Sequence, residues 1–185
     1  MKMIFVAFAR PRGLYASVLN RAAAFLTRGQ YCHCELAVSW TEEQMRTFLG
    51  EVSGWERLRM YKHSSDGRVL LSFYSNLGDR VNFKFLSKTH IDPFYCVYDD
   101  AWDQIPMKYS FEEEKKIVRF LLDQVGSPYD LAGAWLFFVP WRRERKSYGK
   151  YFCSQLVACA LNHSGKALPN PGSLSPNGLY KYLLH

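Results

Sequence analysis

The segment Tyr151–Leu161 constrains the fold of this chain more than any other stretch. From Cys153, apolar residues recur three, four, seven and eight positions further on, which is the spacing of one face of an α-helix. The polar residues 162–164 and Gly165 then provide a C-terminal stop. The pattern predicts a buried helix with Cys153 in its first turn.

A cysteine at that place has two readings. The unpaired backbone N–H groups and the positive end of the helix dipole favour a reactive thiolate. The alternative is an inert core residue, which is the commoner fate of a free cysteine.

Size and composition narrow the choice of protein class. The 185 residues suit a single domain, and 48% hydrophobic and 16% aromatic residues exclude a disordered chain. The net charge of +7 suits an anionic partner such as nucleic acid, phospholipid headgroups or an acidic substrate. Five cysteines, with no secretory leader and no apolar run long enough to cross a bilayer, predict reduced thiols in a cytoplasm, that of the host if the chain is viral.

Hydrophobic periodicity and turn residues predict the remaining elements. Residues 41–66 read as an insertion that opens with a short helix, and residues 166–185 read as a turn-rich tail. Strands are expected at Met3–Ala9, Tyr31–Val38, Arg68–Ser75, Arg80–Leu86 and Phe94–Tyr98. Helices are expected at Leu14–Thr27, Thr41–Leu49, from a Ser110 capping box to Val125, and at Leu131–Val139.

The strand that follows the first helix carries the candidate base. Strict alternation places one set of residues on a core-like face (Cys32, Cys34, Leu36, Val38) and a polar set on the other (Tyr31, His33, Glu35, Ala37). Glu35 or a neighbouring group could orient His33 while His33 addresses Cys153. The plainer reading is a surface carboxylate beside a solvated histidine. His63 and His90, in loop-like sequence, stay rival bases.

A metal or redox centre is not expected. Alternation points Cys32 and Cys34 away from His33, and the chain has no CxxC pair. Cys159 lies about 240° around the helix from Cys153, so these two thiols do not share a face. We therefore expect no cofactor.

The apolar run from Leu131 stands beside a basic cluster, and two readings stay open. We favour a buried helix followed by a solvated loop. The alternative is an anchor on an anionic membrane surface through Trp141, Arg142, Arg143 and Arg145. Exposed aromatics interleaved with basic residues are too sparse to predict a nucleic-acid groove, and the sequence has no phosphate loop, GxSxG or HExxH motif.

Three stretches together resemble a known family. They are the histidine strand around His33-Cys34-Glu35, the segment Gly126–Asp130, and the start of the cysteine helix at Phe152–Val157. In this order they resemble the circularly permuted NlpC-type papain-like superfamily, which has viral and bacterial members and is related to the lecithin:retinol acyltransferase-like proteins. The resemblance covers most of residues 3–161.

The resemblance implies an α+β fold, with the nucleophile helix packed on an antiparallel sheet that carries the histidine. It implies Cys153 as nucleophile, His33 as base and Glu35 as third polar residue. Tyr129 is the implied substrate contact, and Ser154 and Tyr31 are further candidates. Gln155 stands where many relatives show Glu, and the asparagine-cysteine-glutamate-histidine signature of the acyltransferases is absent.

The expected function is a cysteine hydrolase that cleaves an amide, peptide, isopeptide or ester bond through an acyl-enzyme. One alternative is a membrane-associated lipid acyltransferase or phospholipase. The other is a catalytically silent basic binding module. The sequence leaves the substrate and the oligomeric state open.

Overall fold

A five-stranded antiparallel sheet forms the centre of the molecule, in the order β4-β3-β2-β1-β5. The computed structural model describes residues 4–12, 17–53, 67–86, 100–136 and 149–185. The strands are β1 (Ile4–Ala9), β2 (His33–Thr41), β3 (Arg68–Ser75), β4 (Val81–Phe85) and β5 (Trp102–Met107). The helices are α1 (Val18–Leu26), α2 (Glu42–Glu51), α3 (Phe111–Asp123), α4 (Leu131–Leu136), α5 (Cys153–His163), the 3-10 turn η4 (Pro171–Ser173) and α6 (Pro176–Leu184). The α+β class expected from the sequence is therefore confirmed.

One predicted strand lies outside the described residues, and one strand of the structure was not predicted. The expected strand Phe94–Tyr98 lies outside the described residues. The strand β5 was not among the expected elements, because Pro106 lowers the strand propensity of its sequence. It fits here because β5 pairs only with β1, at an edge of the sheet, where a missing N–H costs least.

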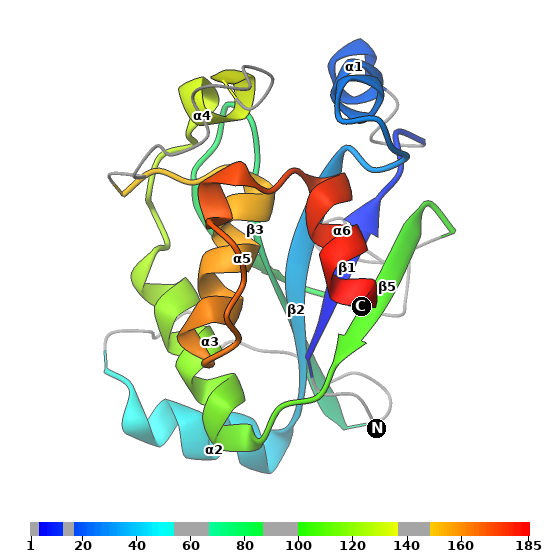
Figure 1. The fold of residues 1–185 in the computed structure, drawn as a ribbon. Helices are drawn as coiled ribbons and strands as arrows, with labels where there is room; N and C mark the ends of the chain where they lie inside the picture. Colours follow the sequence, from blue (N-terminus) through cyan, green and yellow to red (C-terminus); the bar gives the residue numbers. More distant parts are fainter. Residues whose placement is uncertain (1–3, 13–16, 54–66, 87–99, 137–148) are drawn as a thin grey trace.

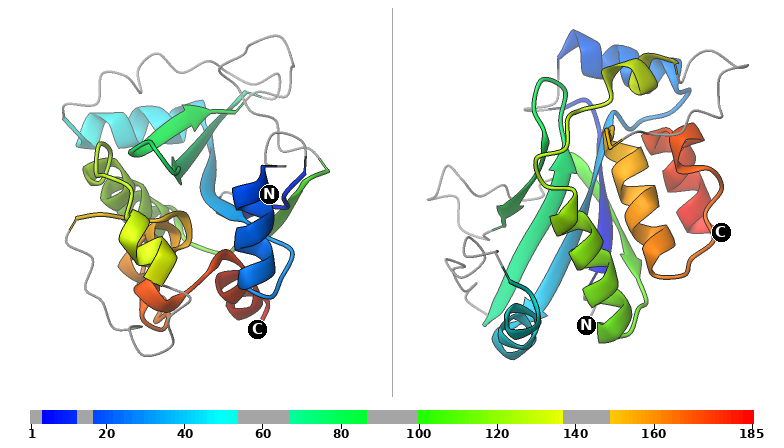
Figure 2. Two further views of the ribbon diagram at one scale, coloured as in Figure 1. Left: turned by 90° about the horizontal axis from the view of Figure 1, so that it is seen from above. Right: turned by 90° about the vertical axis from the view of Figure 1, so that its left-hand side faces the viewer.

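The helix of Cys153 lies on one face of this sheet. It packs against β2 and β3 and is flanked by α3 and α6 (Figure 1; Figure 2, right). Alternate residues of β2, namely Cys34, Leu36 and Val38, enter the core together with the predicted inward residues of α5. The other face of β2 is buried as well: Glu35 is 0% exposed, which differs from the half-solvated strand expected.

The segment 41–66 is integral to the fold where it is described. Thr41 and Gln44 form a capping box that starts α2, and α2 packs on β2 and β3. Residues 54–66 lie outside the described residues. A second capping box at Ser110 starts α3, as predicted.

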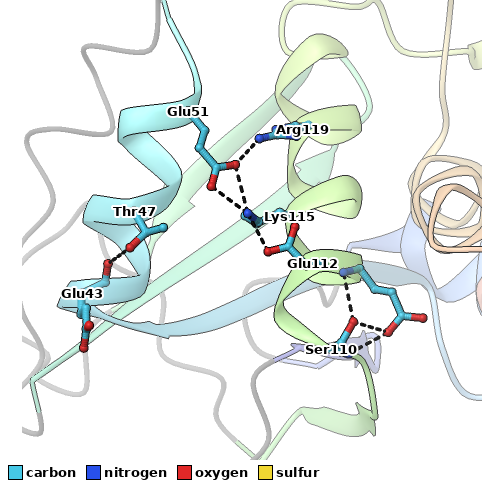
Figure 3. A network of polar contacts seen from close by, with 8 residues as sticks. Glu43, Thr47, Glu51, Ser110, Glu112, Lys115 and Arg119 are labelled. Atoms are coloured by element: carbon cyan, nitrogen blue, oxygen red, sulfur yellow. Dashed lines mark hydrogen bonds and ion pairs between the residues drawn. The ribbon is translucent and has the colours of Figure 1, made fainter.

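Figure 3 shows where α2 and α3 meet. Lys115 Nζ donates to Glu51 Oε1 at 2.7 Å, and Arg119 also donates to the Glu51 carboxylate. Glu112 pairs with Lys115 from the same helix at 2.8 Å. The carboxylates are solvent-exposed, so the network orients the two helices more than it stabilises them.

The C-terminal tail is more ordered than the sequence suggested. It contains α6, whose first turn is capped by the Ser175 hydroxyl. Asn177 in that turn binds the backbone before β2: Tyr31 N–H donates to Asn177 Oδ1 at 2.9 Å, and Asn177 Nδ2 donates to Tyr31 O at 2.8 Å. A Cβ at Gly29 would lie 2.1 Å from Asn177 Oδ1, so this approach requires glycine.

The helices α1 and α4 lie together at one end of the molecule, the end at which α5 begins (Figure 1). The apolar side predicted for the first helix does not face the core, because Val18, Phe25 and Leu26 are exposed and Ala24 is the buried residue of α1. Leu131 and Ala132 of α4 are exposed too, which departs from the buried helix that we favoured. The two helices thus present apolar surface to solvent.

Among the described residues, no helix has the length and apolarity needed to cross a bilayer.

Candidate active site

Cys153 is the first residue of α5, as the sequence predicted. The N-cap residue is Phe152, and no side chain caps the helix start. The N–H groups of the first turn are therefore not taken up by a capping side chain, and they add to the positive end of the helix dipole. Cys153 is 6% exposed and therefore buried.

The backbone of the segment before α5 is hydrogen-bonded to two distant parts of the chain. Ser75 Oγ, at the end of β3, donates to Tyr151 O at 2.7 Å. Tyr151 N–H donates to Pro128 O at 3.1 Å, and Tyr129 and Tyr151 form a parallel bridge. These contacts fix where α5 starts relative to the sheet.

His33 is the first residue of β2 and contacts Cys153. Burial lowers the pKa of His33, but the negative charge of Cys153, its hydrogen bond to the ring and the nearby Glu35 together raise the pKa to about 9. His33 is 6% exposed. The sequence-predicted pair therefore meets in the folded chain, although 120 positions separate the two residues.

The carboxylate of Glu35 holds three side chains around it. Its Oε1 lies 3.4 Å from His33 Nε2 and 2.7 Å from Lys84 Nζ, and its Oε2 accepts from Ser72 Oγ at 2.7 Å. Burial raises the pKa of Glu35, but the hydrogen bond to His33 and the charge of Lys84 outweigh it and bring the pKa to about 2. Glu35 is thus a buried, ionised carboxylate against the imidazole.

Cys34 approaches Cys153 as well, from the core side of β2. The hydrogen bond from Cys34 is the largest cause that lowers the pKa of Cys153; burial opposes it, and the charge and hydrogen bond of His33 lower the pKa further. The net pKa of the Cys153 thiol is well below its ordinary value. Burial and the neighbouring Cys153 raise the pKa of Cys34, which therefore stays a thiol and can donate.

Tyr129 also belongs to the surroundings of the sulfur. Burial, followed by the charges of Cys153 and Cys34, raises the pKa of the Tyr129 hydroxyl, so this group stays protonated beside the thiolate. The substrate contact that the resemblance implies for Tyr129 stays a prediction.

Two other candidates have structural contacts of their own. Tyr31 is buried against Phe8 and Tyr180, and its hydroxyl donates to Asp103. Ser154 is buried, and its Oγ donates to Leu174 O at 2.7 Å, which ties α5 to the segment before α6. Both hydroxyl groups therefore have protein partners, and the substrate contacts predicted for Tyr31 and Ser154 stay predictions.

The remaining candidates are the other histidines and the residues of the predicted membrane anchor. His163 closes α5 and stacks on Phe120, with ring centroids 4.2 Å apart, so it lies at the opposite end of the helix from Cys153. The two rival bases and the proposed membrane anchor lie outside the described residues (His63, His90, Trp141, Arg142, Arg143, Arg145).

Sequence reasoning missed three members of the site: Cys34, Ser72 and Lys84. Cys34 was assigned to the core, where it does lie, but the same side chain also touches the thiol. Lys84 alternates with the apolar residues of β4, as Asn82 does, so the sequence indicates a solvated lysine rather than a buried ion pair. Ser72 carried no signal either.

No protein-family model, curated protein or solved structure matches this chain. Among the described residues, no group of three or more histidine, cysteine or acidic side chains could hold a metal ion.

Proposed function

We propose that this protein is a cysteine hydrolase that cleaves an amide, peptide, isopeptide or ester bond. The observation that carries the proposal is the buried contact between Cys153 and His33, in which the thiol pKa is lowered and the imidazole pKa is raised. A thiolate beside an imidazolium at neutral pH is the ground state of a thiol nucleophile.

The proposed reaction runs in two halves. The Cys153 thiolate attacks the carbonyl carbon, and the N–H groups of the first turn of α5 stabilise the oxyanion. The imidazolium of His33 protonates the leaving group as the C–N or C–O bond breaks, which leaves an acyl-enzyme. Water then attacks the thioester while His33 takes its proton, and the acid is released with the Cys153–His33 pair restored.

Glu35 orients the base in this scheme. Because His33 Nε2 lies toward Glu35, Nδ1 is the nitrogen that exchanges a proton with Cys153. Ser72 and Lys84 hold the carboxylate in turn. The ionised Glu35 also stabilises the imidazolium during both halves of the reaction.

We further propose that the fold is the permuted papain-like one that the sequence resembles. Three described features support it: a cysteine at the mouth of a core helix, an antiparallel sheet beneath that helix, and a histidine at the start of a strand that precedes the cysteine in sequence.

The test is the reaction of Cys153 with iodoacetamide between pH 5 and 9, read by peptide mass spectrometry. We expect Cys153 to react at pH 6 about 100-fold faster in wild type than in His33→Ala, because the substitution removes the charge that holds the thiolate. Cys159, whose pKa burial raises to about 11, is the internal control and should react slowly in both proteins. Equal rates at Cys153 would refute the proposal. A screen of acyl and peptidyl reporters, with Cys153→Ala as the blank, then reads turnover.

A second candidate is a lipid acyltransferase or phospholipase on the same scaffold, favoured by the exposed apolar surface of α1 and α4. It differs from the first in the acyl acceptor: transfer to an added alcohol or amine, rather than release of free acid, would establish it. Full biological activity of Cys153→Ser would instead favour a binding module without catalysis.

A further inference from the structure

A cleft opens between α1, α4 and the turn that joins β3 to β4. All three lie at the end of the molecule where α5 begins (Figure 1; Figure 2, right). The cleft has a volume of about 140 Å³. Its walls are largely aliphatic and include Leu19, Ala23, Leu26, Leu77, Leu131 and Ala134.

Two residues that line the cleft lie next to the Cys153–His33 pair in the fold. Cys32 and Tyr129 line it: Cys32 directly precedes His33, and Tyr129 forms a parallel bridge with Tyr151, two residues before Cys153. Burial raises the pKa of both side chains, and the charge of Cys153 raises it further, which agrees with this placement. The same two side chains therefore border both the cleft and the proposed nucleophile. A substrate whose carbonyl carbon sits at Cys153 could lay its adjoining chain past them.

The lining selects against charged and strongly polar ligands. None of the described residues that line the cleft is charged, and Asn20, Cys32 and Tyr129 are its polar side chains. A bound peptide would bring backbone N–H and C=O groups that need partners when buried, and these walls offer few. A hydrocarbon chain needs none and gains free energy from leaving water.

The apolar surface continues outside the cleft. Leu19, Leu26, Leu77 and Leu131 are between 48% and 56% exposed, so they line the opening as well as the interior. The volume equals about four or five water molecules at about 30 Å³ each, which suits a medium-length alkyl segment. A longer chain would extend onto this leucine rim.

We propose that the cleft binds the linear aliphatic acyl chain of the substrate, and that the protein removes such chains from esters, thioesters or amides. This inference rests on the proposed hydrolase function, because it assigns the acyl side of the bond that Cys153 attacks.

The test uses alkyl methanethiosulfonates with methyl, butyl, hexyl and decyl chains on the intact protein. The Cys153 thiolate attacks the reagent's alkyl-bearing sulfur, a mixed disulfide forms and methanesulfinate leaves, so the reading needs no turnover. Rates at Cys153 are measured by peptide mass spectrometry. We expect at least a tenfold rise from methyl to hexyl and a plateau beyond, because each CH₂ that enters the cleft contributes up to about fourfold.

Two variants should change this dependence. Ala23→Phe fills the cleft from α1 and should reduce the hexyl-to-methyl ratio to near one. Ala132→Phe is the matched control, since Ala132 is exposed on α4 and does not line the cleft. Leu131→Asp places a charge at the opening and should lower the ratio without filling the volume, which covers the case in which Ala23→Phe does not fold. Circular dichroism monitors the fold of each variant.

The outcomes separate the two proposals. If Cys153 reacts quickly with every reagent at the same rate, the acyl-chain assignment is overturned and the hydrolase proposal stands. If Cys153 reacts as slowly as Cys159 with all of them, the hydrolase proposal itself fails. A chain-length dependence that persists unchanged in Ala23→Phe and Leu131→Asp would place the apolar site elsewhere and overturn the assignment to this cleft.

Discussion

The Cys153 thiolate is supported by two neighbours on consecutive residues of β2. Cys34 reaches it from the core face, and His33 reaches it from the end of the strand. A thiol is a weak hydrogen-bond donor, but next to a thiolate in a buried place the bond is charge-assisted. Cys34 therefore lowers the pKa of Cys153 by a hydrogen bond, and His33 lowers it by its positive charge and a hydrogen bond.

Replacement of Cys34 separates these two contributions. Cys34→Ala removes the donor, so we expect the pKa of Cys153 to rise and its alkylation at pH 6 to slow by about tenfold. Cys34→Ser keeps a donor of similar size and should retain most of the rate. The measurement is the pH profile of iodoacetamide labelling at Cys153. Matching profiles for Cys34→Ala and wild type would show that His33 alone holds the thiolate.

At the scale of the elements, one carboxylate joins three strands. Glu35 on β2 binds Ser72 on β3 and Lys84 on β4, and the sheet register brings them together, since Ser72 pairs directly with Lys84. Lys84 is nearly buried and Glu35 is fully buried. Such a pair contributes little net stability, but removal of one partner leaves a buried charge without compensation.

A double-mutant cycle measures this coupling. We expect Lys84→Met to lower the free energy of unfolding by about 3 kcal/mol, because Glu35 then stays charged and buried. Lys84→Met combined with Glu35→Gln should cost clearly less than the sum of the single changes. Urea unfolding followed by fluorescence gives the values. Additive costs would mean that Lys84 and Glu35 do not depend on one another.

The contact of α6 with the start of β2 is a second element-scale dependence. Asn177→Ala leaves the buried N–H and C=O of Tyr31 without their partner, which we expect to cost about 3 kcal/mol. Hydrogen exchange at the Tyr31 amide should accelerate more than exchange in α3. Lys181→Ala, an exposed change on the same helix, is the control. Unchanged exchange at Tyr31 would contradict this role for Asn177.

At the scale of the whole molecule, the buried carboxylate of Glu35 makes the stability depend on pH. The pKa of Glu35 is about 2, below its ordinary 4.5, so its contribution is complete above pH 4.5 and is lost as the pH falls toward 2. Burial lowers the pKa of His33, but this pKa is about 9, above its ordinary 6.5, because the Cys153 thiolate lies beside it, and the pKa of Cys153 is lowered in return. Between pH 6.5 and 9 the pair therefore holds one proton in the folded and in the unfolded chain, and it adds no pH dependence there.

We therefore expect the free energy of unfolding to fall as the pH drops from about 4.5 toward 2, because Glu35 takes up a proton in the unfolded chain before it does so in the folded one. This loss of unfolding free energy at low pH amounts to about 3 kcal/mol from Glu35, and it should be largely absent in Glu35→Gln. Asp123→Asn, which changes an exposed carboxyl on α3, should keep it. Urea unfolding midpoints measured from pH 3 to 9 test this. If Glu35→Gln loses as much stability at low pH as wild type, the loss comes from other carboxyl groups.

Local signals in the sequence predicted much of this molecule. The period of α5 and the alternation along β2 located Cys153 and His33, because each pattern reports burial within a single element. The partners of Glu35 were not predictable, since residues 35, 72 and 84 meet only through the pairing register of three strands. The helix α6 was missed because Ser175-Pro176, its N-cap and first residue, also reads as a turn.

The hydrogen bonds between Asn177 and the Tyr31 backbone have a consequence for the order in which the parts of the fold form during synthesis. The ribosome completes β2 long before α5, and Asn177 of α6, which binds the start of β2, is added later still. An unfinished polypeptide thus carries His33 without Cys153, and then both without Asn177. The hydrogen bonds of Asn177 to Tyr31 can therefore form only after both Cys153 and His33 have been synthesised.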